Sequence, residues 1–247
     1  MPDIILIMKK LVLTILAAGC IILSFAQGKK DWSKIDLSGR PGDHFMLQAS
    51  SDHWTGAPDS IKNKETGFSR GANVYVMIDK PFKSNPRFSI GLGVGISSSS
   101  MYFKNLDIDI AASGSVVPFN KVDTTDHFKK YKLVSNFIEL PVELRFSSDP
   151  ANDKKSIKAA LGVKIGTLLN VHTKGKNLQN KDGKTINSYT LKENKKNFFN
   201  TTRISLTGRV GIGHFSVFGS YAFTNIFKDG TAAAIKPFQV GICLSGL

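Results

Sequence analysis

The chain has 247 residues and a formal net charge of +14, and 41% of its residues are hydrophobic while 21% are charged. This balance excludes a disordered chain and a bundle of membrane helices. The length fits one large domain or two small ones. Phenylalanine is common, with 17 residues, and its placement in short alternating runs favours β-structure over helix.

The N-terminus has the parts of a secretory signal. Lys9 and Lys10 form a positive region, residues 11–25 are mostly apolar, and a small-x-small cleavage site follows. We therefore predict a signal peptide over residues 1–26. The polar residues 27–42 show no periodicity, and we interpret them as a periplasmic lead-in.

A rival prediction keeps a lipid-bearing cysteine at the start of the mature chain. Residues 17–20 resemble a lipobox, in which Cys20 would carry the lipid. The apolar run continues past Cys20, which favours cleavage after Ala26 instead. Cleavage there leaves Cys243 as the one remaining cysteine, which excludes an intramolecular disulfide and a cysteine-cluster metal site.

From residue 43 onward, apolar and polar residues alternate in runs that polar segments separate. Ile138, Leu140 and Val142 share one face of such a run, and Glu139 and Glu143 share the other. Because successive side chains of a strand point to opposite faces, each run needs one apolar and one polar environment. The predicted strands cover residues 43–51, 69–79, 86–103, 131–147, 156–171, 199–212, 214–226 and 236–247.

The connections between these strands alternate in length. A soluble sandwich or a lipocalin would also have two-faced strands, but strict alternation of long loops and short turns is typical of outer-membrane barrels. We therefore predict an all-β fold over residues 43–247. It is a closed up-and-down antiparallel transmembrane β-barrel of about eight strands, with long extracellular loops and short periplasmic turns. The long connections are 52–68, 104–130, 172–198 and 227–235, and the short ones are 80–85, 148–155 and the turn at Gly213.

The polar face of the predicted strands carries both acidic and basic side chains. Side chains fill the lumen of a barrel this small, and a buried charge without a partner is costly. We therefore predict a closed, non-conducting lumen with a network of paired charges, in which glycines leave room for long side chains. The members of the network are Arg87, Glu139, Glu143, Arg145, Lys158, Lys164, Arg203 and Arg209.

Aromatic residues near the predicted strand ends fit the interfacial girdles of a membrane barrel. The alternative is that they are ordinary core aromatics of a soluble β-protein. Pro141, which lies within a strand, predicts a bulge or an edge-like position. The candidate girdle residues are Phe82, Phe88, Tyr102, Phe103, Tyr131, Phe146, Phe198, Phe199, Phe223, Phe227 and Phe238.

The run from Asn136 to Phe146, NFIELPVELRF, resembles a strand signature of PorT-like and related outer-membrane β-barrel domains of Bacteroidota. Residues 221–227 and 238–242 resemble two later strands of the same group, and the glycine-rich residues 91–95 also fit it. The resemblance implies a Gram-negative outer-membrane barrel. Because a named member is associated with gliding and type IX secretion, it also implies an alternative role in a secretion or gliding apparatus.

The set that comes nearest to a catalytic site consists of His172, Asp126 and His127, at the predicted outer rim. A lipid-modifying hydrolase would need an activated nucleophile beside them, and no motif such as G-x-S-x-G accompanies them. Glu139 and Glu143 lie about 13 Å apart along a strand, which is too far for joint acid–base work. We therefore predict no enzymatic activity, no cofactor and no metal site.

The predicted loop at residues 172–198 is basic and rich in asparagine. Contact with lipopolysaccharide phosphates or with an anionic partner is one interpretation, and a solvated, partly mobile loop is the other. An exported chain rarely meets nucleic acid, so anionic lipid head groups are the expected counter-charge. The lysines of this loop are Lys174, Lys176, Lys181, Lys184, Lys192, Lys195 and Lys196.

The leading functional hypothesis is an outer-membrane barrel with a structural or surface-interaction role. Its expected surroundings are outer-membrane lipid and lipopolysaccharide, and its extracellular loops are available to a protein partner. A component of a secretion or gliding apparatus is the alternative, and an outer-membrane lipid-modifying enzyme is the third hypothesis.

Overall fold

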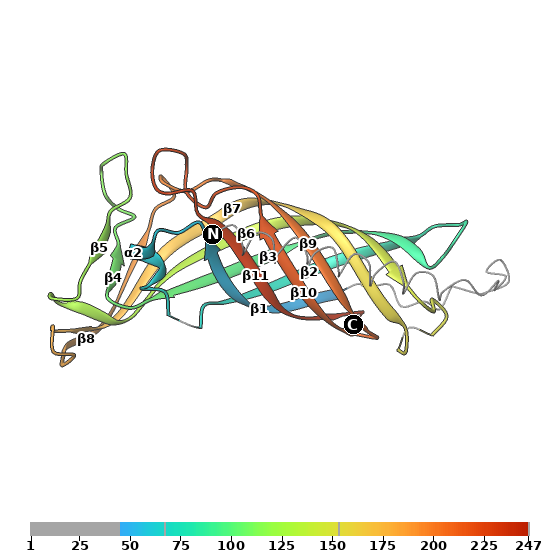
Figure 1. Ribbon diagram of the computed structural model, residues 1–247, viewed down its shortest axis with the longest axis horizontal. Helices are drawn as coiled ribbons and strands as arrows, with labels where there is room; N and C mark the ends of the chain where they lie inside the picture. The colour runs from blue at the N-terminus through green and yellow to red at the C-terminus, as the bar shows by residue number, and fades with distance from the viewer. Residues whose placement is uncertain (1–44, 67, 153, 247) are drawn as a thin grey trace, which may run out of the picture. The chain divides into compact units, whose positions relative to one another are not determined.

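Eight strands form one closed antiparallel barrel in the computed structural model, which describes residues 45–66, 68–152 and 154–246 (Figure 1). The predicted signal peptide and periplasmic lead-in lie outside the described residues. The barrel strands are β1 (Phe45–Thr55), β2 (Arg70–Pro81), β3 (Phe88–Phe103), β6 (His127–Ser147), β7 (Ile157–Gln179), β9 (Thr202–Ile212), β10 (Phe215–Ala222) and β11 (Lys236–Ser245).

The barrel closes because the first and last strands pair with each other. β1 pairs antiparallel with β11 from Met46–Ser245 to Thr55–Lys236. β6 pairs with β7 along almost its whole length, which joins the two halves of the sheet. Every other barrel strand pairs with its neighbours in the chain, once the short strands within the loops are set aside. The predicted closed eight-stranded barrel is therefore confirmed.

Four further elements lie in the long connections, all at one end of the barrel (Figure 1). They are α2 (Asp59–Lys62), β4 (Leu106–Ile108), β5 (Phe119–Lys121) and β8 (Thr185–Asn194). β4 and β5 form a separate two-stranded sheet. In the described residues, no helix has the length and apolar content needed to span a bilayer.

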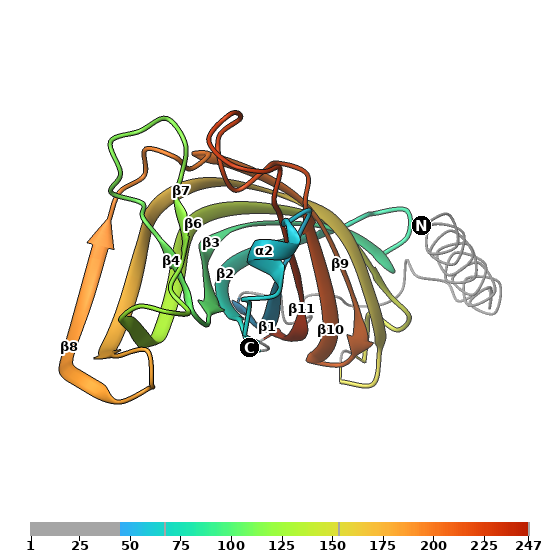
Figure 2. The ribbon, with the colours of Figure 1, turned by 60° about the vertical axis from the view of Figure 1, so that its left-hand side comes forward.

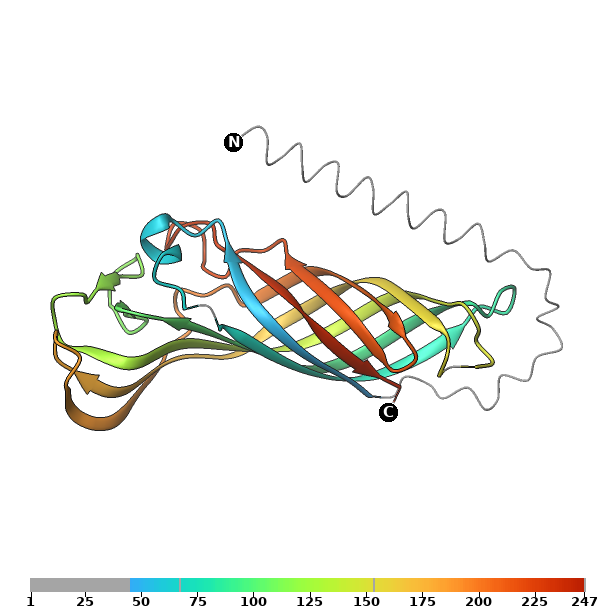
Figure 3. The same cartoon turned by 60° about the horizontal axis from the view of Figure 1, so that its bottom comes forward.

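The predicted loop 172–198 is mostly a β-hairpin. β7 continues to Gln179, and β8 pairs with it at the edge of the sheet (Figure 2). β6 also starts earlier than predicted, at His127, so three strands project beyond the rest of the barrel (Figure 3). Sequence periodicity missed this extension because both of its faces mix polar and apolar residues, which leaves no continuous apolar stripe to detect.

Two irregularities mark the pairing of β6. Its register against β7 shifts between Asn136 and Phe137, so the bulge lies there and not at Pro141 as one interpretation predicted. Opposite Pro141 the register pairs of β3 and β6 stop at Leu92–Val142 and resume at Gly95–Glu139. Proline has no N–H to donate to the ladder, so the edge-like behaviour predicted for Pro141 is local to its β3 side.

The two faces of the strands differ as the alternation predicts. Leu140 and Ile165 are 54% and 50% exposed on the outward face, while Glu139 and Lys164 are 1% and 2% exposed on the inward face. The large apolar residues that cover the outward face from Phe45 to Ile242 form what we call the apolar belt. A soluble barrel would bury these residues and expose the charged ones.

The inward face is less polar than predicted, because two apolar clusters occupy it. Met46, Tyr75, Met77, Phe218 and Cys243 form a small cluster inside the barrel. A larger cluster, the apolar plug, fills the long-loop end. It consists of Trp54, Ile61, Met101, Phe103, Leu106, Ile108, Ile110, Val117, Tyr131, Leu133, Phe137, Leu168, Val171, Phe198, Phe199, Ile226, Phe227 and Ile235.

The plug corrects the predicted aromatic girdle. Five of the candidate girdle residues, Phe103, Tyr131, Phe198, Phe199 and Phe227, are buried inside the plug. They lie near strand ends, as an interfacial residue would, but strand parity and loop folding turn them inward. Phe199 and Phe227 form an isolated antiparallel bridge, and β9 starts later and β10 ends earlier than predicted. Phe82 and Phe223 are exposed, and Phe88, Tyr102, Phe146 and Phe238 are half-buried.

Candidate functional site

Glu139 is the centre of one ion cluster in the lumen. Its Oε1 accepts hydrogen bonds from Arg203 Nε (3.1 Å) and Nη2 (2.7 Å). Its Oε2 accepts one from the Tyr75 hydroxyl (2.5 Å) and lies 3.7 Å from Lys164 Nζ. Arg203 also stacks on the Phe137 ring at 3.8 Å. The cluster therefore ties together five strands, β2, β6, β7, β9 and, through Arg203 and Ser97, β3.

Glu143 is the centre of a second cluster, nearer the short turns. Its Oε2 accepts hydrogen bonds from Arg145 Nε (2.9 Å) and Arg209 Nη2 (3.2 Å). Arg145 Nη1 also lies 3.5 Å from Asp79 Oδ1, and Arg209 Nη1 donates to Ser245 Oγ at 3.1 Å. A charge-assisted network of this kind compensates the loss of water around each buried ion.

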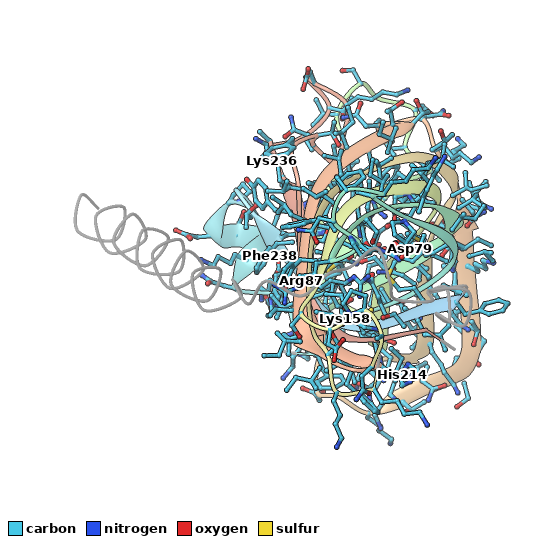
Figure 4. All side chains as sticks on the ribbon, turned by 90° about the vertical axis from the view of Figure 1, so that its right-hand side faces the viewer. Asp79, Arg87, Lys158, His214, Lys236 and Phe238 are labelled. Atoms are coloured by element: carbon cyan, nitrogen blue, oxygen red, sulfur yellow. The ribbon has the colours of Figure 1, made fainter. Side chains whose placement is uncertain are left out.

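Six of the eight predicted network residues therefore meet in two clusters: Glu139, Glu143, Arg145, Lys164, Arg203 and Arg209. Arg87 and Lys158 are half-buried at the end that carries the short turns, and Figure 4 views the barrel from that side with both residues labelled.

Sequence reasoning missed Asp52, Asp79 and Tyr75 as lumen residues. Asp52 accepts hydrogen bonds from Ser50 (2.6 Å), Ser99 and Gln239 (3.2 Å). Parity was the available signal, since Asp52 continues the inward series of β1 and Asp79 that of β2. The first predicted strand stopped at residue 51, one position too early to include Asp52.

Glycines on the inward face make room for this layer. A Cβ on Gly91 would collide with the Arg145 guanidinium, and one on Gly162 or Gly166 would press on Glu143 or Glu139. Around Asp52, Trp54, Ser99 and Arg203 the remaining cavity measures about 10 Å³, which is close to the space of one water molecule. Charged groups, glycines and the apolar plug together occupy the lumen.

Comparison with known proteins decides the family. Residues 25–228 match the model of the outer membrane protein β-barrel domain, which is more than half of the chain. The chain belongs to the outer membrane protein β-barrel domain family. As a member of this family, it lies in the outer membrane, where lipid surrounds its apolar belt. A search of the curated proteins finds no match to this chain.

Two solved structures are similar to this family member at low sequence identity. One is the crystal structure of Ail, the attachment invasion locus protein of Yersinia pestis, and the other is the same protein in complex with the heparin analogue sucrose octasulfate. Each is 12% identical, with TM-scores of 0.33 and 0.32, and the alignment covers 81% of this chain and 94% of Ail.

The candidate catalytic residues of this outer-membrane barrel are not brought together. His172 pairs in register with Val134, whereas His127 pairs with Gln179, seven residues further along β7 and roughly 23 Å away by strand rise. His53 Nε2 lies 3.0 Å from Ser51 Oγ on the outward face of β1, but Asp52 between them points into the lumen. In the described part of the chain, no group of three or more His, Cys, Asp or Glu side chains is arranged to hold a metal.

Proposed function

We propose that this outer-membrane barrel is a non-conducting anchor that presents a contact surface on the outside of the cell. The observation that carries the proposal is the occupied lumen. An ion-paired layer centred on Glu139 and Glu143 lies below an apolar plug that closes the long-loop end. Ions would have to break buried salt bridges or cross an apolar core, and both steps are costly.

The contact surface that we propose is the β7–β8 hairpin with the loops beside it. Ile186, Tyr189 and Leu191 of β8 are large apolar residues that remain exposed. β8 ends the order of the sheet, and a strand edge is a template for pairing with an extended segment of another chain. In a membrane barrel the long loops lie outside the cell, which supports placing this hairpin at the cell surface.

Conductance in a planar bilayer tests the anchor. We expect the folded protein to insert without current steps above the baseline, under conditions in which an open porin gives clear steps. Stable open steps from the wild-type protein would contradict a closed lumen.

Cysteine labelling on intact cells tests the contact surface. Asn187→Cys on the hairpin is expected to react with a membrane-impermeant maleimide, whereas Lys154→Cys in a short turn is expected to react only after permeabilisation. Native Cys243 is 1% exposed, so it gives little background. Labelling of Lys154→Cys in place of Asn187→Cys on intact cells would reverse the proposed orientation.

A role as a component of a secretion or gliding apparatus is the second candidate. The resemblance to PorT-like barrels motivates it, and the exposed apolar residues of β8 favour a protein partner over a purely structural role. Cross-linking from Asn187→Cys in cells tests it. Adducts with secretion components would support this role, and adducts with lipid alone would count against it.

A further inference from the structure

A row of cationic side chains crosses the outward face of the barrel just beyond the apolar belt. We call Arg70, Lys132, Lys174 and Lys192 the cationic row. Lys132 faces Lys174 across β6 and β7, and Lys174 faces Lys192 across β7 and β8. Tyr102 of β3 faces Lys132 from the other side. With neighbouring strands about 4.8 Å apart, the row from β2 to β8 spans about 19 Å.

Tyr102 lies between two of these cations. Arg70 Cζ and Lys132 Nζ lie 5.4 Å and 5.3 Å from the centre of its ring, and Lys132 Nζ donates to Ser100 Oγ at 3.3 Å. Arg70 also lies over the ring of Phe68, which is 73% exposed. Neutral rings and a hydroxyl therefore contact these cations. Such neutral groups compensate a positive charge only in part.

The row lacks acidic neighbours on its own face. Within the described residues, β7 contains no aspartate or glutamate, and the one acid of β8, Glu193, faces the opposite side with Thr173. There, burial and the nearby Asp107 and Asp109 raise the pKa of Glu193. Like charges that face each other across a sheet destabilise it, so the lysines of the row oppose the pairing in which they lie.

A histidine beside the row is affected by the positive charge of the row's lysines. His172 lies two residues before Lys174 on β7, above the apolar belt. Burial lowers its pKa, and Lys192, Lys132 and Lys174 lower it further. Three lysines from three strands thus act on one imidazole.

The height of the row matches the lipid head groups. Leu169 is the last large apolar residue exposed on β7, and Lys174 follows it by five residues, about 16 Å of strand. With a strand tilt of 35–45°, this is roughly 12 Å above the belt, and long lysine side chains can reach back toward it. On the other side of the barrel, aromatic pairs such as Tyr221 with Phe223 lie at the long-loop ends of the strands.

We propose that the cationic row binds the phosphate groups of a phosphorylated glycolipid in the outer leaflet. Such a lipid covers the apolar belt with its acyl chains. Its phosphates therefore already lie at the level of the row, and binding them does not require the lipid to be immobilised first. Its negative charge removes the repulsion between the facing lysines. Phe68 and Tyr102 contact the sugar and the upper acyl carbons. A dissolved anion or an acidic protein would gain nothing from a position at the edge of the belt.

Titration with lipid A that carries both phosphates tests the proposal. The protein is folded in neutral detergent micelles, and the triple variant Lys132→Gln, Lys174→Gln, Lys192→Gln is compared with the wild type. The matched control is Lys181→Gln, Lys184→Gln, Lys196→Gln, which removes the same charge from the same hairpin region. We expect the row variant to bind roughly 100-fold more weakly and the control to bind as the wild type does.

Three outcomes would overturn the proposal. They are equal loss in the control variant, equal binding of lipid A without phosphates, and full displacement by millimolar inorganic phosphate, which would indicate a site for free anions. Folding is checked by the shift in gel mobility on boiling. In lipid-free micelles the row variant should be more stable than the wild type, because repulsion is removed. These readouts do not depend on whether the lumen conducts.

Discussion

At the residue scale, Glu139 shows how a charge is accommodated inside the barrel. Its two carboxylate oxygens are shared among Arg203, Lys164 and Tyr75, which come from three different strands. Without this carboxylate, the buried cations Arg203 and Lys164 would lose the anion that they contact directly. A single side chain therefore maintains the charge balance of the lumen's central layer.

Glu139→Gln is expected to destabilise the protein by about 3–5 kcal/mol, because it leaves Arg203 and Lys164 buried without their counter-charge. The urea midpoint of unfolding in lipid vesicles measures the effect. The matched control is Glu193→Gln on the β7–β8 hairpin, outside the lumen, for which we expect a change within about 0.5 kcal/mol. Equal midpoints for the two variants would mean that the lumen charges are not energetically coupled.

At the element scale, the β7–β8 hairpin is an extension of the barrel with its own determinants. The turn that closes it has Asn180 N donating to Lys184 O at 2.9 Å, and Gly183 adopts φ of +80°. A β-branched residue at such a φ is strained by about 1–3 kcal/mol. Nothing lies within 4 Å of a Cβ at this position, so that strain is the sole penalty.

Gly183→Val is therefore expected to loosen β8 and leave the barrel intact. Hydrogen exchange should speed up in the amides of residues 185–194, while those of β9 and β10 keep their protection. Lys181→Val, in the same turn, is the control. Faster exchange throughout the barrel would show that hairpin and barrel unfold as one unit.

At the scale of the whole molecule, closure depends on the seam between β1 and β11. Gly241 of β11 pairs with Ser50 there, and a Cβ on Gly241 would collide with the backbone of Ala49 and Ser50. Close approach of the two backbones at this point is thus needed for the ring of strands to close. A closed ring has no free edges, which is what allows strands to span a membrane.

Gly241→Val is expected to destabilise the closed barrel by about 1–3 kcal/mol, because the added side chain overpacks the contact between β1 and β11. The measurement is the fraction of protein that shifts in gel mobility on boiling, which we expect to fall. Gly219→Val is the matched control, since the one atom near a Cβ there is Gln239 O at 3.9 Å. Normal folding of Gly241→Val would show that the seam tolerates a wider spacing.

The sequence by itself determined the class of fold, the number of barrel strands and the two-sided pattern of those strands. Ile138, Glu139 and Leu140 alternate because a strand is two-sided, and that periodicity is a local property of the chain. The same parity indicated Glu143, Lys164 and Arg209 as inward residues before any partner was known.

The tertiary structure alone decided which charges meet and where the barrel ends. Glu139 and Arg203 are 64 residues apart, and only the order and stagger of the strands bring them to one level. The apolar plug also escaped prediction, because Phe103, Phe199 and Phe227 occupy strand ends where lipid and loop contacts look alike in sequence. Only the folded loops, through β4 and β5, supply the apolar surroundings that turn these rings inward.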